Sequence, residues 1–160
     1  LCSALIQCHL DYSCSSWYPS LNNCLKNKLQ ICQNKVIRFI NGMGPRESVN
    51  SCSLAKMSLL NVDNRNKQLR LNHVFKIVNN KCPLYMNENF TYVKDVHSYS
   101  TRANMYNFSV PKCYGKENMT FFYCAIKDWN DLPNHIKNIN NLNKFKASVK
   151  LHLLSNAKEQ

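Results

Sequence analysis

Hydrophobic residues recur at steps of three and four over residues 21–40. This spacing predicts a helix of about five turns with one apolar stripe, the kind of face that usually packs on a core. Ser20 is a suitable N-cap for this helix, and the sequence Asn-Gly-Met-Gly-Pro at 41–45 is a stop signal. The stripe consists of Leu21, Leu25, Leu29, Cys32, Val36 and Phe39 or Ile40.

A shorter apolar helix is expected ahead of this segment, over residues 1–11. Its apolar side would carry Leu5, Cys8 and Tyr12. Because the two predicted helices are joined by a short corner, we expect them to pack as an antiparallel or crossing pair.

The same periodicity predicts three further helical segments. Residues 53–80 would form a short helix followed by a longer one that Asp63 caps, with an apolar face of Leu71, Val74, Phe75 and Val78. Residues 120–129 would place Phe121, Phe122, Ala125 and Trp129 on one face. Residues 143–154 would do so with Phe145, Val149 and Leu153.

The periodicity fades over residues 83–111, and only the stretch 105–110 alternates well enough for one short strand. The sequence therefore predicts a mainly α fold, a small helical bundle with an irregular middle segment that could include one short β-hairpin. Residues 1–82 would form the first helical region, 83–117 the irregular linker or hairpin, and 118–160 a helical extension that packs on the first part.

The composition is that of one ordinary domain with a strong basic excess. The chain has 160 residues, of which 44% are hydrophobic, and its 21 Lys and Arg face 9 Asp and Glu for a formal net charge of +12. Such a field indicates either an anionic partner, of which nucleic acid is the commonest, or basic residues that only face solvent. No apolar run approaches the roughly 18 residues that would span a bilayer, so we expect an intracellular protein, nuclear or cytoplasmic, that is neither membrane-bound nor secreted.

Residues for bond-making chemistry are missing. The Asp residues include no adjacent pair for two-metal catalysis, the three Gly form no phosphate loop, and no nucleophile elbow occurs. The nine Cys include no C-x-x-C or C-x-x-H pair, and Cys24, Cys32 and Cys124 occupy positions where a helix favours a small apolar residue. We therefore expect no catalytic residue, no metal site, no cofactor and no small-molecule ligand.

The basic residues remain as candidates for binding. Lys28 and Lys35 are seven residues apart and, with Arg38, would form a positive edge along the 21–40 helix, suited to a phosphate backbone. Arginine can grip phosphate with two hydrogen bonds, which makes the arginines the sharper candidates. The alternative is an ordinary solvated helix face. The predicted nucleic-acid-binding residues are Lys28, Lys35, Arg38, Arg65, Arg70 and Arg102.

An ordered set of motifs carries a family resemblance. In chain order they are ALIQCHLDYSCSSWYP at 4–19, LQICQNKVIRFI at 29–40, LLNVDNR at 59–65, Lys76, CPLYM at 82–86, Ser100-Thr101-Arg102, Thr120-Phe121, WNDLP at 129–133 and FKASVKLHLL at 145–154. This set resembles the segment that follows the reverse-transcriptase palm in non-LTR retrotransposons of the jockey and chicken-repeat type.

The resemblance implies a thumb-like helical region with a C-terminal extension, which holds the RNA or DNA template–primer duplex beside the palm of the same polyprotein. It implies that Lys35, Arg38, Arg65 and Arg102 contact the nucleic-acid backbone. The palm with its F/Y-x-D-D metal site is absent from this sequence, so the chain belongs to an RNA-directed DNA polymerase only by resemblance, is expected to be inactive alone, and would need Mg²⁺ only through that palm.

A second hypothesis stays open at this point. The chain could be a relic or repurposed helical interaction module without a nucleic-acid role, in which Leu21, Leu29 and Val36 face a protein partner. That hypothesis predicts an exposed apolar patch and self-association in isolation.

Overall fold

The computed structural model describes residues 6–50, 53–54, 57–96, 106–113 and 115–156. The elements in chain order are α1 (Cys8–Asp11), α2 (Cys14–Trp17), η2 (Tyr18–Ser20), α3 (Asn23–Asn41), α5 (Val62–Val78), η3 (Leu84–Asn89), α6 (Val93–Val96), η4 (Gly115–Met119), α7 (Phe121–Asn130), α8 (Asn134–Lys137) and α9 (Leu142–Asn156). The predicted mainly α fold is confirmed.

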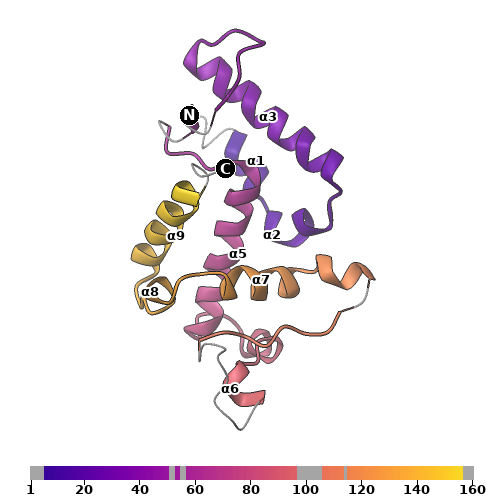
Figure 1. The fold of residues 1–160 in the computed structure, drawn as a ribbon, viewed down its shortest axis with the longest axis vertical. Coiled ribbons are helices and arrows are strands. Elements are labelled where there is room, and N and C mark those ends of the chain that lie inside the picture. The colour runs from indigo at the N-terminus through magenta and orange to yellow at the C-terminus, as the bar shows by residue number, and fades with distance from the viewer. Residues whose placement is uncertain (1–5, 51–52, 55–56, 97–105, 114, 157–160) are drawn as a thin grey trace.

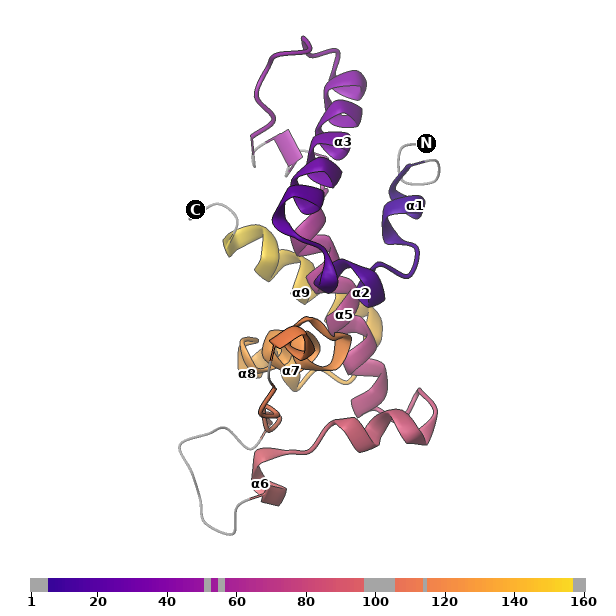
Figure 2. The same cartoon turned by 90° about the vertical axis from the view of Figure 1, so that its right-hand side faces the viewer.

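Helix α5 is the axis of the molecule (Figures 1 and 2). It makes its most extensive contacts with α7 and α9, and α1, α2, α3 and η3 also pack against it. In Figure 1, α7 crosses the lower half of α5 while α9 lies beside it, and α3 occupies the opposite end of the molecule from α6. The chain is therefore organised around one central helix.

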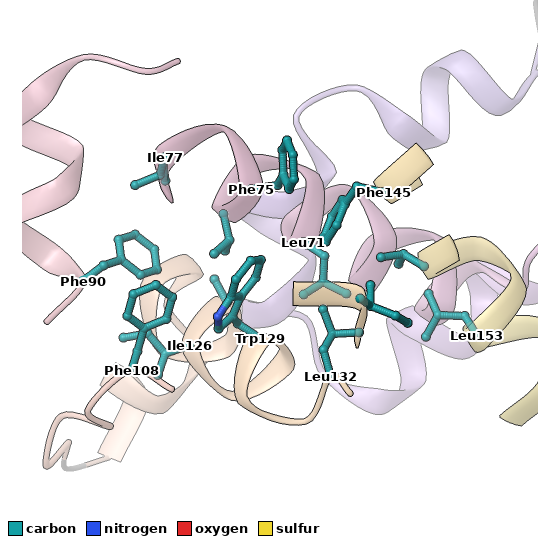
Figure 3. Close-up of a cluster of buried hydrophobic side chains, with 14 of the residues drawn as sticks. Leu71, Phe75, Ile77, Phe90, Phe108, Ile126, Trp129, Leu132, Phe145 and Leu153 are labelled. Carbon is teal, nitrogen blue, oxygen red and sulfur yellow. The ribbon is translucent and has the colours of Figure 1, made fainter. Parts of the chain in front are cut away.

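The core lies where α5, α7, α8, α9 and the middle segment meet (Figure 3). Figure 3 shows Trp129 at the centre of the cluster, with Phe90 and Phe108 on one side and Phe145 and Leu153 on the other. The ring centroids of Trp129 lie 5.9 Å from Phe108 and 6.0 Å from Phe145. Through these two contacts, the large buried ring of Trp129 on α7 connects the irregular segment with α9.

The predicted faces of the later helices match the buried residues. Leu71, Val74 and Phe75 of α5 are buried, while Val78 lies at the edge of the core. On α9 the buried residues are Phe145, Val149 and Leu153. Thr120 accepts a hydrogen bond from the backbone of Tyr123 and so caps α7. The cap of α5 is Asn61 in place of the predicted Asp63, which lies in the first turn.

The prediction for the 21–40 stripe was wrong in its packing. Helix α3 buries Gln33 and Ile37, and no member of the predicted stripe is fully buried. Cys24 and Cys32 are exposed and Cys124 is half-buried, so the predicted packing role fails for the first two. The cause is geometric: α3 touches α5 along a side about a quarter-turn from its apolar face.

The helix predicted over residues 1–11 is helical wherever the structure describes it, over residues 6–11. Residues 1–5 lie outside the described residues, and α1 covers Cys8–Asp11. Cys8 and Tyr12 are exposed, so they do not form the expected packing side. Helix α1 packs on α2 and α5, which means that α5 takes the place of α3 as its main neighbour.

The predicted strand is reduced to one antiparallel bridge between Tyr92 and Phe108 in the described part of residues 105–110. The other edge of Phe108 is occupied by a side chain, because its N–H donates to Asn130 Oδ1 and its carbonyl accepts from Asn130 Nδ2, both at 2.8 Å. The amide of Asn130 therefore takes the place of a strand on that other edge. The bridge to Tyr92 does not extend, because helix α6 begins at Val93.

Candidate nucleic-acid interface

Helix α3 is a 19-residue helix with four basic residues and no Asp or Glu in its sequence. Asn22 caps its start by accepting a hydrogen bond from the N–H of Leu25 at 2.9 Å, and Gly42 ends it with a left-handed φ of 63°. The two caps mark the ends of a helix whose positive charge is not balanced by any carboxylate of its own.

Two glutamines fix which side of α3 faces inward. Gln33 Nε2 donates to the carbonyl of Leu60 at 2.9 Å, and Gln30 Oε1 accepts from the N–H of Val62 at 2.9 Å. Both bonds reach the turn that begins α5, and Ile37 is fully buried beside them. The opposite side of α3 is therefore turned to solvent.

That outward face carries both predicted lysines. Lys28 and Lys35 are exposed, and neither forms a salt bridge with a carboxylate among the residues that the structure describes. Their spacing of seven residues places them about 10 Å apart along the helix axis. Large apolar side chains flank them, including Phe39 at 88% exposure and Leu25 at 43%.

Arg38 lies one turn beyond Lys35, at the edge of this face, and it is half-buried where the two lysines are exposed. Its Nε donates to the carbonyl oxygen of Glu47 at 2.7 Å. The bond anchors the segment after the helix, so one of the five N–H groups of Arg38 already has an internal acceptor.

Arg65 on α5 is held by Asp11. Its Nη2 lies 2.7 Å from Asp11 Oδ2, its Nε donates to the same carboxylate, and Nη1 donates to Gln68 Oε1 at 2.8 Å. These groups border a polar cavity of about 350 Å³ that Lys150 of α9 also lines. The guanidinium therefore ties α1 to α5 and has a carboxylate partner.

Arg70 is buried in the interior. Its Nε and Nη2 each lie 2.7 Å from Asp128 Oδ2, and Nη1 donates to Asn66 Oδ1. Burial raises the pKa of Asp128, while Arg70 and Lys67 oppose that effect. A phosphate cannot reach this guanidinium without opening the contact between α5 and α7, so Arg70 does not belong to the candidate interface.

The six predicted residues do not form one site. Helix α3 carries Lys28, Lys35 and Arg38. Helix α5 carries Arg65 and Arg70, and each of these two arginines is paired with a carboxylate, from α1 and α7 respectively. Arg102 lies outside the described residues.

A second basic helix was not among the sequence-based predictions. Helix α9 has three lysines and no Asp or Glu in its sequence, and Lys144 and Lys146 are exposed. The signal that could have found it is the stretch without carboxylates over 142–156.

No cluster of three or more His, Cys, Asp or Glu suited to a metal occurs among the described residues. None of the described helices is long and apolar enough to cross a membrane. Searches of protein-family models, curated proteins and solved structures return no match to this chain.

Proposed function

We propose that this chain binds nucleic acid through backbone phosphates on the outward face of α3, as the thumb-like part of a non-LTR reverse transcriptase whose palm lies elsewhere. The observation that carries the proposal is the charge of α3, which has four cations, no carboxylate, and two exposed lysines on one face. The motif resemblance supports it independently. Catalysis would belong to the palm.

The spacing of the two lysines suits a nucleic-acid strand. About 10 Å corresponds to the axial rise of roughly three phosphates of one strand, at about 3.4 Å of duplex axis per phosphate. Phosphate contacts hold a duplex in register without reading its sequence. The proposed binding is therefore independent of sequence and weakens steeply as salt concentration rises.

The test is the salt dependence of binding to an RNA–DNA heteroduplex, followed by fluorescence anisotropy. The double variant Lys28→Gln/Lys35→Gln should bind more weakly and lower the slope of log K against log salt by about 0.9 for each phosphate that the protein no longer neutralises. Lys144→Gln/Lys146→Gln removes the same charge from exposed positions on α9 and is the matched control. Equal effects of the two variants would show that net charge alone drives binding.

The interaction-module hypothesis is favoured by a different observation. Phe39, Leu25 and Ile40 are exposed at 88%, 43% and 45% on the same helix. Exposed apolar area of this kind marks a surface that another protein could cover. Sedimentation of the wild type beside a Leu25→Ser/Phe39→Ser variant tests it, since only the wild type should self-associate.

A further inference from the structure

A second open site lies away from α3, between the middle segment and the C-terminal helices. It is a cavity of about 450 Å³. Exposed residues form its rim: Lys94, Tyr106, Asn138 and Asn140. Trp129, only 2% exposed, and Lys137, 9% exposed, form its floor. A cavity of this volume, with a solvent-exposed rim and a buried floor, has the size of a small-molecule site.

The floor holds a buried ammonium group with neutral partners. Lys137 Nζ donates to Asn107 Oδ1 at 2.8 Å and to the carbonyl of Asn130 at 3.1 Å. No carboxylate among the described residues lies within salt-bridge distance of it. Burial lowers the pKa of Lys137, while the more distant charge of Asp131 opposes this. A buried cation without an ion-pair partner is costly unless an anion compensates it.

An ammonium group has three N–H donors, and the two bonds to Asn107 and Asn130 leave one of them without a described acceptor. Lys137 lines the cavity, and Lys94 stands at the rim with its Nζ 5.1 Å from the ring centroid of Tyr92. The cavity thus has one cation at its floor and one at its mouth. Either ammonium group can bind an anionic group such as a phosphate.

The rest of the wall is aromatic and amide. Tyr92, Tyr106 and Trp129 line the cavity, and Tyr106 is 48% exposed. The indole N–H of Trp129 donates to the carbonyl of Tyr106 at 3.0 Å, which fixes the aromatic floor against the rim. Asn138 and Asn140 add amide donors and acceptors. Aromatic rings beside amides suit a nucleobase, which stacks and hydrogen-bonds along its edge.

We propose that this cavity binds one nucleotide unit of an unpaired strand, with its phosphate between Lys94 and Lys137 and its base against Tyr92 and Tyr106. Asn138 and Asn140 contact the edge of the base. The site extends the proposed function to single-stranded nucleic acid. It shares no residue with the outward face of α3, so each site can fail without the other.

Part of the role of Lys137 is structural, because its bond to the carbonyl of Asn130 caps the end of α7. Replacing Lys137 therefore alters the end of α7 as well as the cavity. Lys94 is exposed on the short helix α6, so its replacement leaves the core intact. Lys81, exposed and outside the lining of the cavity, is the control lysine.

Trp129 supplies the readout. The chain has two tryptophans, and a Trp17→Phe background leaves Trp129 as the single reporter at the floor. Adenosine monophosphate, adenosine, inorganic phosphate and an unlabelled oligothymidylate are titrated against this protein, with excitation at the red edge of indole absorption. Adenosine monophosphate or the oligonucleotide should change the emission, and adenosine and phosphate alone should bind at least about tenfold more weakly.

The lysine variants decide the outcome. Lys94→Gln and Lys137→Met should each weaken binding, the latter by about tenfold or more, while Lys81→Gln leaves it unchanged. Binding of the oligonucleotide but not of the mononucleotide, with the same dependence on lysine, supports a site for a strand. Unchanged emission with every probe, equal binding of phosphate alone, or indifference to Lys94 and Lys137 would overturn the proposal. Heteroduplex binding through α3 is measured separately and stays informative in each case.

Discussion

Helices α3 and α5 have similar lengths, 19 and 17 residues, but opposite relations between pattern and burial. Helix α3 has the clearer separation of apolar and polar residues, yet it buries only Gln33 and Ile37. Helix α5 mixes the two kinds of residue along its length and is buried on several sides, polar residues included. The amphipathic helix lies at the periphery, and the mixed one forms the axis.

An apolar stripe on a helix does not by itself show how the helix packs. Periodicity shows which face of a helix gains from leaving water, but it does not name the element that covers that face. A central helix with neighbours on several sides is buried without a single apolar stripe. Its buried polar side chains then need hydrogen-bond or ion-pair partners on the neighbouring helices. Gln68 donates to the carbonyl of Lys146 and Arg70 pairs with Asp128, so α5 meets that need through α9 and α7.

The largest expected effect contrasts two phenylalanines. Phe75→Ala opens a cavity in the core, where Phe75 stacks on Phe145 at 4.5 Å, and should lower the free energy of unfolding by about 3 to 5 kcal/mol. Phe39→Ala removes an exposed ring from α3 and should change it by less than about 0.5 kcal/mol. Urea unfolding followed by circular dichroism measures both. Similar losses would mean that α3 is covered as α5 is.

The next effect compares two carboxylates that both approach Lys67, at 3.5 Å for Asp128 and 3.7 Å for Asp131. Asp128→Ala leaves the buried guanidinium of Arg70 without its counter-ion and should cost about 3 kcal/mol. Asp131→Ala removes a side chain that is 70% exposed and should cost about 0.5 kcal/mol or less. Thermal unfolding of the two variants in one buffer separates them, and equal shifts in Tm would contradict the buried network.

A smaller effect tests how α3 is attached. Gln33→Ala leaves the buried carbonyl of Leu60 without its hydrogen-bond donor and should lower the free energy of unfolding by about 1 to 2 kcal/mol. Asn27→Ala on the exposed side of the same helix is the control and should be near neutral. Native-state hydrogen exchange of the α3 amides reports the loss locally. If both variants exchange like the wild type, α3 is not held through this glutamine.

The smallest effect concerns the start of α3. Asn22→Ala removes the side chain that caps the helix and should cost about 1 kcal/mol. The sequence predicts Ser20 as the cap, but its hydroxyl donates to the carbonyl of Trp17, so Ser20→Ala should cost less than Asn22→Ala. The helical circular-dichroism signal during urea titration ranks the two. A larger loss for Ser20 would move the cap back to the position that the sequence suggests.

The sequence predicted the buried residues correctly where a single face of a helix packs on the core. The buried apolar residues of α9 and most of those of α5 were predicted, because the predicted residues face the cluster around Trp129. The helix predicted over residues 120–129 nearly coincides with α7, whose cap Thr120 accepts a hydrogen bond from the N–H of Tyr123.

Sequence reasoning failed where a contact spans the chain. Arg65 and Arg70 looked like free cations, but Asp11 and Asp128, which occupy them, are 54 and 58 residues away. No local pattern signals such pairs. The same limit hid Lys137, whose partner Asn107 is 30 residues away in the irregular segment.

The most direct test of the central claim is the placement of charge, with net charge held equal. The salt slope of heteroduplex affinity is measured for the wild type, Lys28→Gln/Lys35→Gln and Lys144→Gln/Lys146→Gln, over about 50 to 200 mM salt. If α3 carries the phosphate contacts, the first variant flattens the slope while the second stays close to the wild type. A wild-type affinity that does not respond to salt, or identical slopes for the two variants, would contradict a phosphate-binding face on α3.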